Sequence, residues 1–464
     1  MGIGNTMIKY SSFLHLLEEQ ASRNPDAPAI IRDLQGRPAA VSWSDLQAMV
    51  LSKSDELRSC GRKRPGILCD GSLACVVTVF ACAAAGMQSV LLDPMLPDEA
   101  LQAQILAADA DMLWIPEELA DDVDLKIPDS GNALPPSVEN EPARILFFTS
   151  GTTAMSKAVV LTERSLLASA WNGSSMLPLS QQDILLCVLP LNHVFGFVCS
   201  LLWGMTCGAA VALGRGIRHF ADDFAYFSPT AVSVIPLLLE FMIRQDAFNP
   251  ELRTILVGAG DCPRPLMDTV LTKGIRLCFG YGLTETSSGV AISTGGDPYA
   301  LEICPDDTVT IAPDGEILIS APTCMMQGYY RHPEDTAQVL KGGILHTGDL
   351  GFLDENGCLH VTGRKKEMIV LPDGTKLFLP EYETQLGAVL KNRDFAVIEL
   401  NSSPVLVIAG DPSEKTQILE TLKPVMALRP RGQQLRDILF TGAPLPRTAT
   451  GKVKRLELAE QFKK

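Results

Sequence analysis

The sequence is poor in aromatic and charged residues, and positive charge is in the minority. Aromatic side chains make up 6% of the 464 residues, and charged side chains make up 20%. Lys and Arg number 39 against 54 Asp and Glu, which gives a formal net charge of −15. A surface this acidic repels phosphate backbones and anionic lipids, so we expect no nucleic-acid partner. Any phosphate that binds must be met by individually placed Lys and Arg side chains.

Motifs for metal binding and for secretion are missing as well. The chain has 12 cysteines, yet no two are spaced as C-x-x-C, which disfavours zinc and redox sites. The first ten residues contain no apolar signal core. We therefore expect a cytoplasmic protein with reduced thiols. The length and the 46% hydrophobic content suffice for two or three domains with large cores.

Two uncharged stretches are long enough to suggest a membrane helix, which needs roughly 20 apolar residues. They run from Gly71 to Leu92 and from Ile184 to Gly214. Gly86 interrupts the first, and Pro190 and several glycines interrupt the second. We interpret the first as helix, turn and strand, and the second as strand, loop, helix and strand of a buried α/β core. A membrane transporter is the alternative, and the Gly and Pro interruptions of both stretches disfavour it.

Short apolar runs alternate with helical segments along most of the chain. The runs "ILFFTS", "TAVSVIP" and "TILVGAG" lead into turns, which is typical of buried parallel strands followed by crossover helices. From "GEILIS" onward the pattern is hairpin-like, and a second, smaller α/β segment follows Arg364. The sequence predicts an α/β fold in which residues 1–365 form a large N-terminal domain of stacked αβ subdomains plus a β-rich subdomain. Residues 366–464 are predicted to form a small, mobile C-terminal α+β domain.

A hydroxyl-rich loop is the first candidate site. In "FFTSGTTAMSKAVVLT", an apparent strand leads into a loop that carries four hydroxyls, one glycine and Lys157. Backbone N–H groups, hydroxyls and a cation are what a polyphosphate needs. The loop is not a Walker loop, because G-x-x-x-x-G-K-[ST] is absent. An ordinary Ser/Thr turn is the alternative.

Three further segments offer carboxylates and cations. "GYGLTETSSG" places Glu285 after two glycines, where a carboxylate beside phosphates is a natural magnesium ligand. "LHTGDLGF" carries Asp349, and Arg364 follows Gly363; a carboxylate can accept both hydroxyls of a ribose. "PRTATGKVKR" could deliver the ammonium of Lys452 to a charged phosphorus centre. The alternatives are a solvated turn, a surface hairpin with a salt bridge, and a basic tail.

Taken in this order, the four segments resemble the adenylate-forming superfamily of acyl-CoA synthetases, luciferases and peptide-synthetase adenylation domains. The resemblance runs from "LLEEQASRNPDAPAI" to "TGKVKR" and includes "PLNHVFGF" and "GYYRHPEDT". "GRKKEMIVLPDG" looks most like the fatty acyl-CoA synthetase branch. The resemblance implies an AMP-forming acid–thiol ligase that uses ATP, Mg²⁺ and CoA, or the phosphopantetheine of a carrier protein in place of CoA.

The resemblance also implies roles for single residues. The catalytic residues would be Lys452, which bridges the acid and the α-phosphate, Thr284 at the α-phosphate, and Glu285 at the magnesium. Lys366 would be the hinge, and Gly374 would give space in the thiol tunnel. The ATP-binding residues would be Thr149, Ser150, Gly151, Thr152, Thr153 and Lys157 at the phosphates, Gly258, Ala259, Gly260, Tyr281 and Gly282 near the adenine, and Asp349 and Arg364 at the ribose.

The acid and its acceptor are less specified. His193, Phe195 and Pro236 are the candidate pocket residues. Relatives that activate amino acids place an Asp near His193, and its absence from "PLNHVFGF" disfavours an amino acid. Apolar surroundings favour an aliphatic acid, and with it fatty acid metabolism. Two alternatives stay open: an acyl-AMP ligase that loads an acyl carrier protein, and a non-catalytic nucleotide-binding protein on the same fold.

Overall fold

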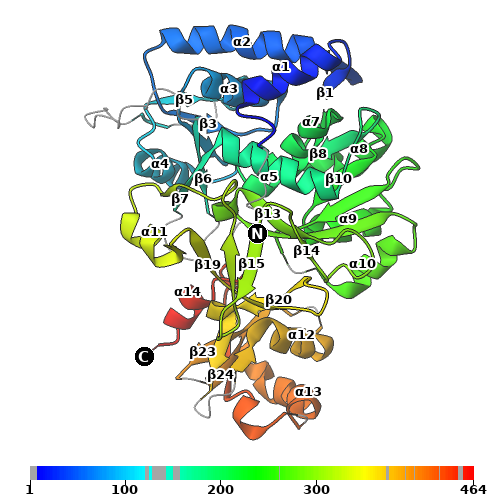
Figure 1. Cartoon of the computed structure of the whole chain (residues 1–464). Coiled ribbons are helices and arrows are strands. Elements are labelled where there is room, and N and C mark those ends of the chain that lie inside the picture. The colour runs from blue at the N-terminus through cyan, green and yellow to red at the C-terminus, as the bar shows by residue number, and fades with distance from the viewer. Residues whose placement is uncertain are drawn as a thin grey trace.

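Two large mixed sheets form the upper part of the molecule, and a smaller module lies below them (Figure 1). The structure is a computed structural model that describes the following residues: 8–120, 125–127, 143–149, 157–260, 262–371, 376–391, 393–401, 403–427, 429–447 and 453–463. The predicted α/β class, with a large N-terminal part and a small C-terminal α+β part, is confirmed.

The first sheet has nine strands in the order β14-β13-β12-β11-β10-β8-β9-β1-β2. The strands from β8 to β12 are parallel, as their buried apolar sequences predict. Their bounds are β1 Pro28–Leu34, β2 Arg37–Ser42, β8 Ile184–Cys187, β9 Ala210–Leu213, β10 Ala231–Val234, β11 Thr254–Val257, β12 Arg276–Leu283, β13 Ser288–Ile292 and β14 Glu302–Ile303.

The second and third sheets complete the upper part. The second has the order β17-β7-β6-β4-β3-β5, and the third is an antiparallel sheet in which β19 pairs with β16, β18 and β20. The bounds are β3 Pro65–Leu68, β4 Ser89–Leu92, β5 Met112–Trp114, β6 Arg144–Phe148, β7 Ala158–Thr162, β15 Thr308–Ile311, β16 Glu316–Ser320, β17 Gly328–Tyr329, β18 Leu340–Lys341, β19 Ile344–Leu353 and β20 Leu359–Arg364.

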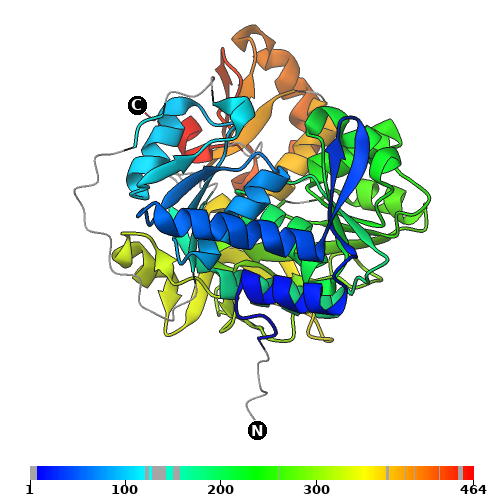
Figure 2. The same cartoon turned by 90° about the horizontal axis from the view of Figure 1, so that it is seen from above.

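Helices cover the sheets and join them. Figure 2, seen from above, shows the blue helices α1 and α2 lying across the two large sheets, and α5 packs against β7, β13 and α7. The bounds are α1 Phe13–Arg23, α2 Trp43–Ser59, α3 Leu73–Ala84, α4 Asp98–Ala107, α5 Glu163–Met176, α6 Val194–Gly196, the π-helical η2 Phe197–Leu202, α7 Trp203–Cys207, α8 Phe220–Phe227, α9 Pro236–Gln245, α10 Arg264–Leu271 and α11 Pro333–Val339.

The C-terminal module begins after the short 3₁₀ turn η5, Lys365–Glu367. It contains two small sheets, β21-β22 and β23-β24-β25, with three helices around them. The bounds are β21 Met368–Val370, β22 Lys376–Phe378, α12 Leu379–Leu390, β23 Phe395–Leu400, β24 Ser403–Ala409, α13 Lys415–Ala427, β25 Asp437–Thr441 and α14 Arg455–Glu460.

Four phenylalanine rings connect the two large sheets. Phe13 of α1 stacks on Phe80 of α3 at 4.4 Å between ring centroids. Phe197 of η2 contacts both Phe13, at 5.9 Å, and Phe147 of β6, at 5.7 Å. Aromatic contacts of this kind are each worth about 1 kcal/mol beyond the area that they bury. The cluster therefore fixes η2, which follows β8, against the strand that leads into the hydroxyl-rich loop.

The two uncharged stretches fold as the sequence predicts. Gly71–Leu92 supplies α3 and β4, and Ile184–Gly214 supplies β8, the helical run α6-η2-α7 and β9. Among the described residues, no helix is both long enough and apolar enough to span a bilayer.

Asp307, just before β15, is a carboxyl group buried at 8% exposure. Its Oδ2 accepts a hydrogen bond from Asn172 Nδ2 of α5 at 3.1 Å, and its Oδ1 has no hydrogen-bond partner among the described residues. Burial, aided by the neighbouring charge of Asp306, raises the pKa of Asp307 from 3.8 to about 8. The folded protein therefore keeps this proton between about pH 4 and pH 8, whereas the unfolded chain releases it.

We expect Asp307→Asn to stabilise the protein at pH 8 and to change little at pH 4. In the window between the two pKa values the folded state binds more protons than the unfolded state, so the stability of the parent falls as the pH rises. The neutral amide removes that loss. The measurement is the thermal midpoint at both pH values. Asp268→Asn, the same charge change on the exposed face of α10, is the control, and an equal pH trend in both variants would contradict the assignment.

Candidate functional site

The candidate site lies where the parallel strands of the first sheet end. In the sheet, β8 is hydrogen-bonded to β9 on one side and to β10 on the other. The chain therefore crosses back over β8 after β9, and the strand order reverses between β8 and β10. Ligands of open α/β sheets bind at the carboxyl ends of the strands beside such a reversal. His193 and Phe195 follow β8, and Pro236 follows β10. The structure thus brings the three predicted pocket residues to the edge where a ligand is expected.

The predicted adenine segment borders this pocket. Gly258 follows β11, and a Cβ there would lie 2.8 Å from the Phe195 ring. A Cβ on Gly260 would lie 3.6 Å from Pro236. Ala259 between them has a φ of 63°, a left-handed conformation that costs a non-glycine residue about 1 kcal/mol or more. Backbone strain of this kind concentrates at ligand sites.

His193 faces a charge that the sequence does not reveal. Burial lowers the pKa of its imidazole, and the charge of Asp93 partly opposes that shift. Asp93 directly follows β4 of the second sheet, so the carboxyl ends of the two large sheets face one another here. A neutral His193 offers one hydrogen-bond donor and one acceptor, and its tautomer decides which ring nitrogen plays each part.

The β12–β13 hairpin presents the next group of predicted residues. A Cβ on Gly282 would lie 1.6 Å from the backbone oxygen of Ser288, so only glycine fits at this close approach. Ser287 and Ser288 both have positive φ values, 54° and 108°. The tight return leaves Thr284 and Glu285 half-buried in the short turn η4, Thr284–Thr286, at the edge of the sheet.

Asp349 is held by two partners. Tyr281 donates its hydroxyl to Asp349 Oδ2 at 2.8 Å, and Arg364 Nε lies 2.8 Å from Oδ1. Asp349 is 3% exposed, which distinguishes the arrangement from a solvated surface hairpin. Burial and the carboxylate charge raise the pKa of Tyr281 well above its ordinary value, so the phenol stays a donor. A carboxylate oxygen has two lone pairs, and a carboxylate can accept the two hydroxyls of a ribose.

Glu285 and Lys157 both contact Tyr329, Glu285 at its hydroxyl and Lys157 over its ring. Tyr329 donates its hydroxyl to Glu285 Oε1 at 2.7 Å. The Lys157 ammonium lies 5.1 Å from the centre of the Tyr329 ring and 3.0 Å from Asp335 Oδ2. Burial, and then the Glu285 charge, raises the pKa of Tyr329, which therefore also remains a donor. The structure brings the predicted phosphate lysine and the predicted magnesium ligand into one cluster.

Tyr329 and Asp335 are the residues that the sequence reasoning missed. Both belong to "GYYRHPEDT", which carried the family resemblance but no assigned role. β17 pairs with β7 so that Tyr329 lies opposite Val159, two residues after Lys157. That register brings the motif to the phosphate loop, and the only sequence signal for it was a tyrosine and an acid inside a recognised motif.

Several predicted residues lie outside the described part of the chain. They are Ser150, Gly151, Thr152, Thr153, Gly374 and Lys452, and the side chain of Lys366. The two ends of the hydroxyl-rich loop are described and are joined. Thr149 N donates to Lys157 O at 3.0 Å, and Lys157 N donates to Thr149 Oγ1 at 3.3 Å. Lys157 therefore stands at a fixed place at the start of β7.

No protein cage for a metal is found among the described residues, where no three His, Cys, Asp or Glu side chains gather suitably. A magnesium ion at Glu285 would take its other oxygens from phosphates and water, which is the usual mode for that ion. Glu285 fits this role, since it is a half-buried carboxylate at the sheet edge whose Oε1 the Tyr329 hydroxyl orients.

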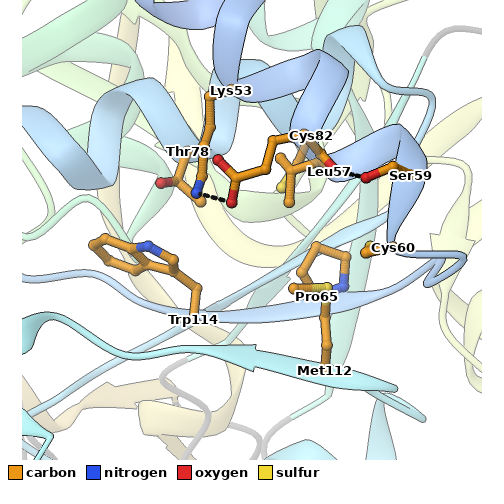
Figure 3. A pocket seen from close by; sticks show the side chains of 10 residues that line it. Lys53, Leu57, Ser59, Cys60, Pro65, Thr78, Cys82, Met112 and Trp114 are labelled. Atoms are coloured by element: carbon orange, nitrogen blue, oxygen red, sulfur yellow. Dashed lines mark hydrogen bonds and ion pairs between the residues drawn. The ribbon is translucent and has the colours of Figure 1, made fainter.

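Two cavities differ in their position relative to this site: a small one lies near Phe195, and a larger one lies apart from the site. One of about 30 Å³ lies between α5, η2, β11 and β13, and is lined by residues such as Gly173, Cys199 and Leu256. Phe195 packs against the apolar cluster that contains Trp203 and Leu256, two residues of this cavity's wall. Another of about 380 Å³ lies between α2, α3, β3 and β5; Figure 3 shows Trp114 opposite Lys53 in its wall, and Lys53 pairs with Glu56. It shares no residue with the candidate site.

Comparisons with known proteins point to one family. The model of the AMP-binding enzyme family matches residues 17–330. The 2-succinylbenzoate–CoA ligase of Bacillus cereus (strain AH820) is 29% identical over 394 residues, which cover 76% of this chain and 78% of that protein. Among solved structures, the O-succinylbenzoate CoA synthetase of Bacillus subtilis with ATP and magnesium superposes with a TM-score of 0.76 at 22% identity, covering 96% and 99% of the two chains. The Mycobacterium tuberculosis fatty acyl CoA synthetase gives 0.71 at 19% identity, covering 97% and 98%.

We expect Gly282→Ala to disrupt the β12–β13 hairpin. The added methyl would collide with backbone atoms of Ser288, which cannot give way as a flexible side chain can. Gly289→Ala is the matched control, because Gly289 pairs with Gly282 and a Cβ there meets nothing within 4 Å. Gly282→Ala should lower the thermal midpoint by several degrees and speed amide exchange in β12 and β13. Equal behaviour of the two variants would show that the close approach is not a constraint.

Proposed function

The chain belongs to the family of AMP-binding enzymes, and from this premise we propose that it activates a carboxylic acid with ATP and transfers the acyl group to the thiol of CoA. The observation that supports this most directly is the spacing between Tyr281 and Glu285 on the β12–β13 segment. Tyr281 reaches the Asp349–Arg364 pair, and Glu285, four residues later, reaches Tyr329 beside Lys157. A nucleotide that spans the two clusters would have its ribose at one and its phosphates at the other.

The proposed binding mode follows the two clusters. Asp349 and Arg364 hold the ribose, Gly258 to Gly260 and Tyr281 border the adenine, and Lys157 with the loop from Thr149 to Thr153 holds the phosphates. Glu285 binds Mg²⁺, which offsets the phosphate charge when bound. The relative from Bacillus subtilis was solved with ATP and magnesium, which supports both cofactors.

The chemistry needs this concentration of positive charge. A carboxylate oxygen attacks the α-phosphorus of ATP, a carboxylate–phosphorus bond forms, and the bond from that phosphorus to the pyrophosphate oxygen breaks. Two anions meet in this step, so Lys157 and Lys452 lower the repulsion, and Thr284 contacts the α-phosphate. The thiolate of CoA then attacks the acyl carbon, and AMP leaves. An acyl carrier protein is the alternative acceptor.

Between the two steps, we propose that residues 366–464 rotate as the small domain about Lys366, with Gly374 in the thiol tunnel. Ion pairs flank the hinge on both sides. Lys365 Nζ lies 2.6 Å from Asp314 Oδ2 and 2.7 Å from Glu316 Oε2 in the β15–β16 hairpin. Glu367 lies 3.6 Å from Arg455 in the C-terminal module. The two residues next to Lys366 are therefore each held to a different domain.

We propose an aromatic acid as the substrate class. The sequence favoured an aliphatic acid, but the curated relative named above acts on 2-succinylbenzoate by its name, and that relationship does not support fatty acid metabolism.

Pyrophosphate release tests the activity and the acid class together. The assay supplies ATP, Mg²⁺ and CoA with 2-succinylbenzoate, benzoate, octanoate, palmitate or phenylalanine, and acyl-CoA is measured in the same wells. We expect release with the aromatic acids and formation of their CoA thioesters. Release with palmitate alone would restore the aliphatic substrate. Release without thioester would point to a carrier protein, and silence in every well to a non-catalytic nucleotide-binding protein.

We expect Lys452→Ala to slow adenylation by about 10²–10³ and to leave thioester formation from supplied acyl-AMP largely intact. The ammonium stabilises charge only while the carboxylate attacks phosphorus. Single-turnover assays of each half-reaction measure this difference. Lys454→Ala, two residues along, is the control and should affect neither half. Equal loss in both halves for Lys452→Ala would refute the assigned role.

A further inference from the structure

The Lys157 ammonium, which the proposed function gives to the phosphates of ATP, is already paired with a carboxylate of the protein. Its Nζ lies 3.0 Å from Asp335 Oδ2. The side chains are 36% and 31% exposed, so the pair forms at the surface of the site and can open at small energetic cost. Lys157 is the largest cause of the lowered pKa of Asp335, so the carboxylate is ionised at neutral pH.

The position of Asp335 is built into the fold. Asp335 lies in the first turn of α11, which directly follows β17. Tyr330, beside Tyr329, donates its hydroxyl to Asp109 Oδ2 at 2.7 Å, and Arg331 lies 3.0 Å from the same carboxyl group. These contacts, together with the pairing of β17 with β7, fix the segment that carries Asp335. The carboxylate is therefore held beside Lys157 and does not reach it by chance.

We propose that Asp335 is an internal competitor for the polyphosphate of ATP. Its carboxylate occupies the Lys157 ammonium while the site is empty, leaves it when the β- and γ-phosphates bind, and takes it back as pyrophosphate departs. The inference rests on the proposed function, because it gives Lys157 to the phosphates. Asp335 thus weakens the binding of ATP and of pyrophosphate. It also prevents an unpaired Lys157 ammonium from retaining the product pyrophosphate.

The opposite role makes the opposite prediction. A carboxylate that positioned Lys157 for the phosphates would strengthen polyphosphate binding, and its removal would weaken it. His332 also contacts Asp335, at 3.2 Å from Oδ2, so a purely structural role would appear as loss of stability in every Asp335 variant. The sign of the change in affinity separates these three roles.

The test is equilibrium binding of three probes: α,β-methylene-ATP with Mg²⁺, inorganic pyrophosphate with Mg²⁺, and AMP. We expect Asp335→Asn to bind the first two about 2- to 5-fold more tightly, the size that exposed ion pairs give. AMP should bind unchanged, because it lacks the phosphates that reach Lys157. Asp335→Glu keeps the charge and should resemble the parent. Glu334→Gln removes the same charge from the exposed neighbour and is the matched control.

A double-mutant cycle completes the test. In a Lys157→Met background, Asp335→Asn should no longer alter polyphosphate binding, because the two side chains act as a pair. Unchanged or weaker polyphosphate binding by Asp335→Asn alone would overturn the inference while the acid panel still established adenylation. Failure of the parent to bind any probe would instead overturn the nucleotide site, and with it both proposals.

Discussion

The contact of Gly282 with the Ser288 backbone is the constraint on which the candidate site depends most. This close approach folds β12 back onto β13 within a few residues, so Tyr281 and Glu285 project from the same rigid hairpin. From that segment Tyr281 reaches the β19–β20 hairpin and Glu285 reaches the β17 segment. Three sheets therefore meet at one hairpin, and a shift there would separate the two clusters from each other.

The electrostatics of the site reconcile an acidic protein with an anionic ligand. The chain carries a formal charge of −15, yet the cations of the site are held by carboxylates of its own: Arg364 by Asp349 and Lys157 by Asp335. Pre-paired cations avoid exposing isolated positive charge in the empty protein. The pairing with Asp349 also places Arg364 before the ligand arrives, which lowers the entropy lost on binding, whereas Lys157 must leave Asp335 to meet the phosphates.

The sequence predicted the elements better than the contacts between them. The runs "TAVSVIP" and "TILVGAG" contain β10 and β11, because buried strands that lead into turns are specified locally. The hydrogen bond of Tyr329 to Glu285, and the influence of the Asp93 charge on the pKa of His193, link segments far apart in the chain. They depend on sheet register and on how two sheets face each other, which no local pattern encodes. The acid class was weakly specified for a related reason, since apolar runs pack cores whether or not they line a pocket.

The ion pairs on either side of Lys366 have a mechanical consequence. Lys365 is bound to the β15–β16 hairpin, and Glu367 is bound to Arg455. A rotation that keeps both ion pairs can therefore use only the backbone torsions of the few peptide units between them. Each residue contributes only two soft dihedrals. In the rotation proposed above, a domain joined in this way follows a narrow arc. A domain on a flexible linker would instead sample many orientations.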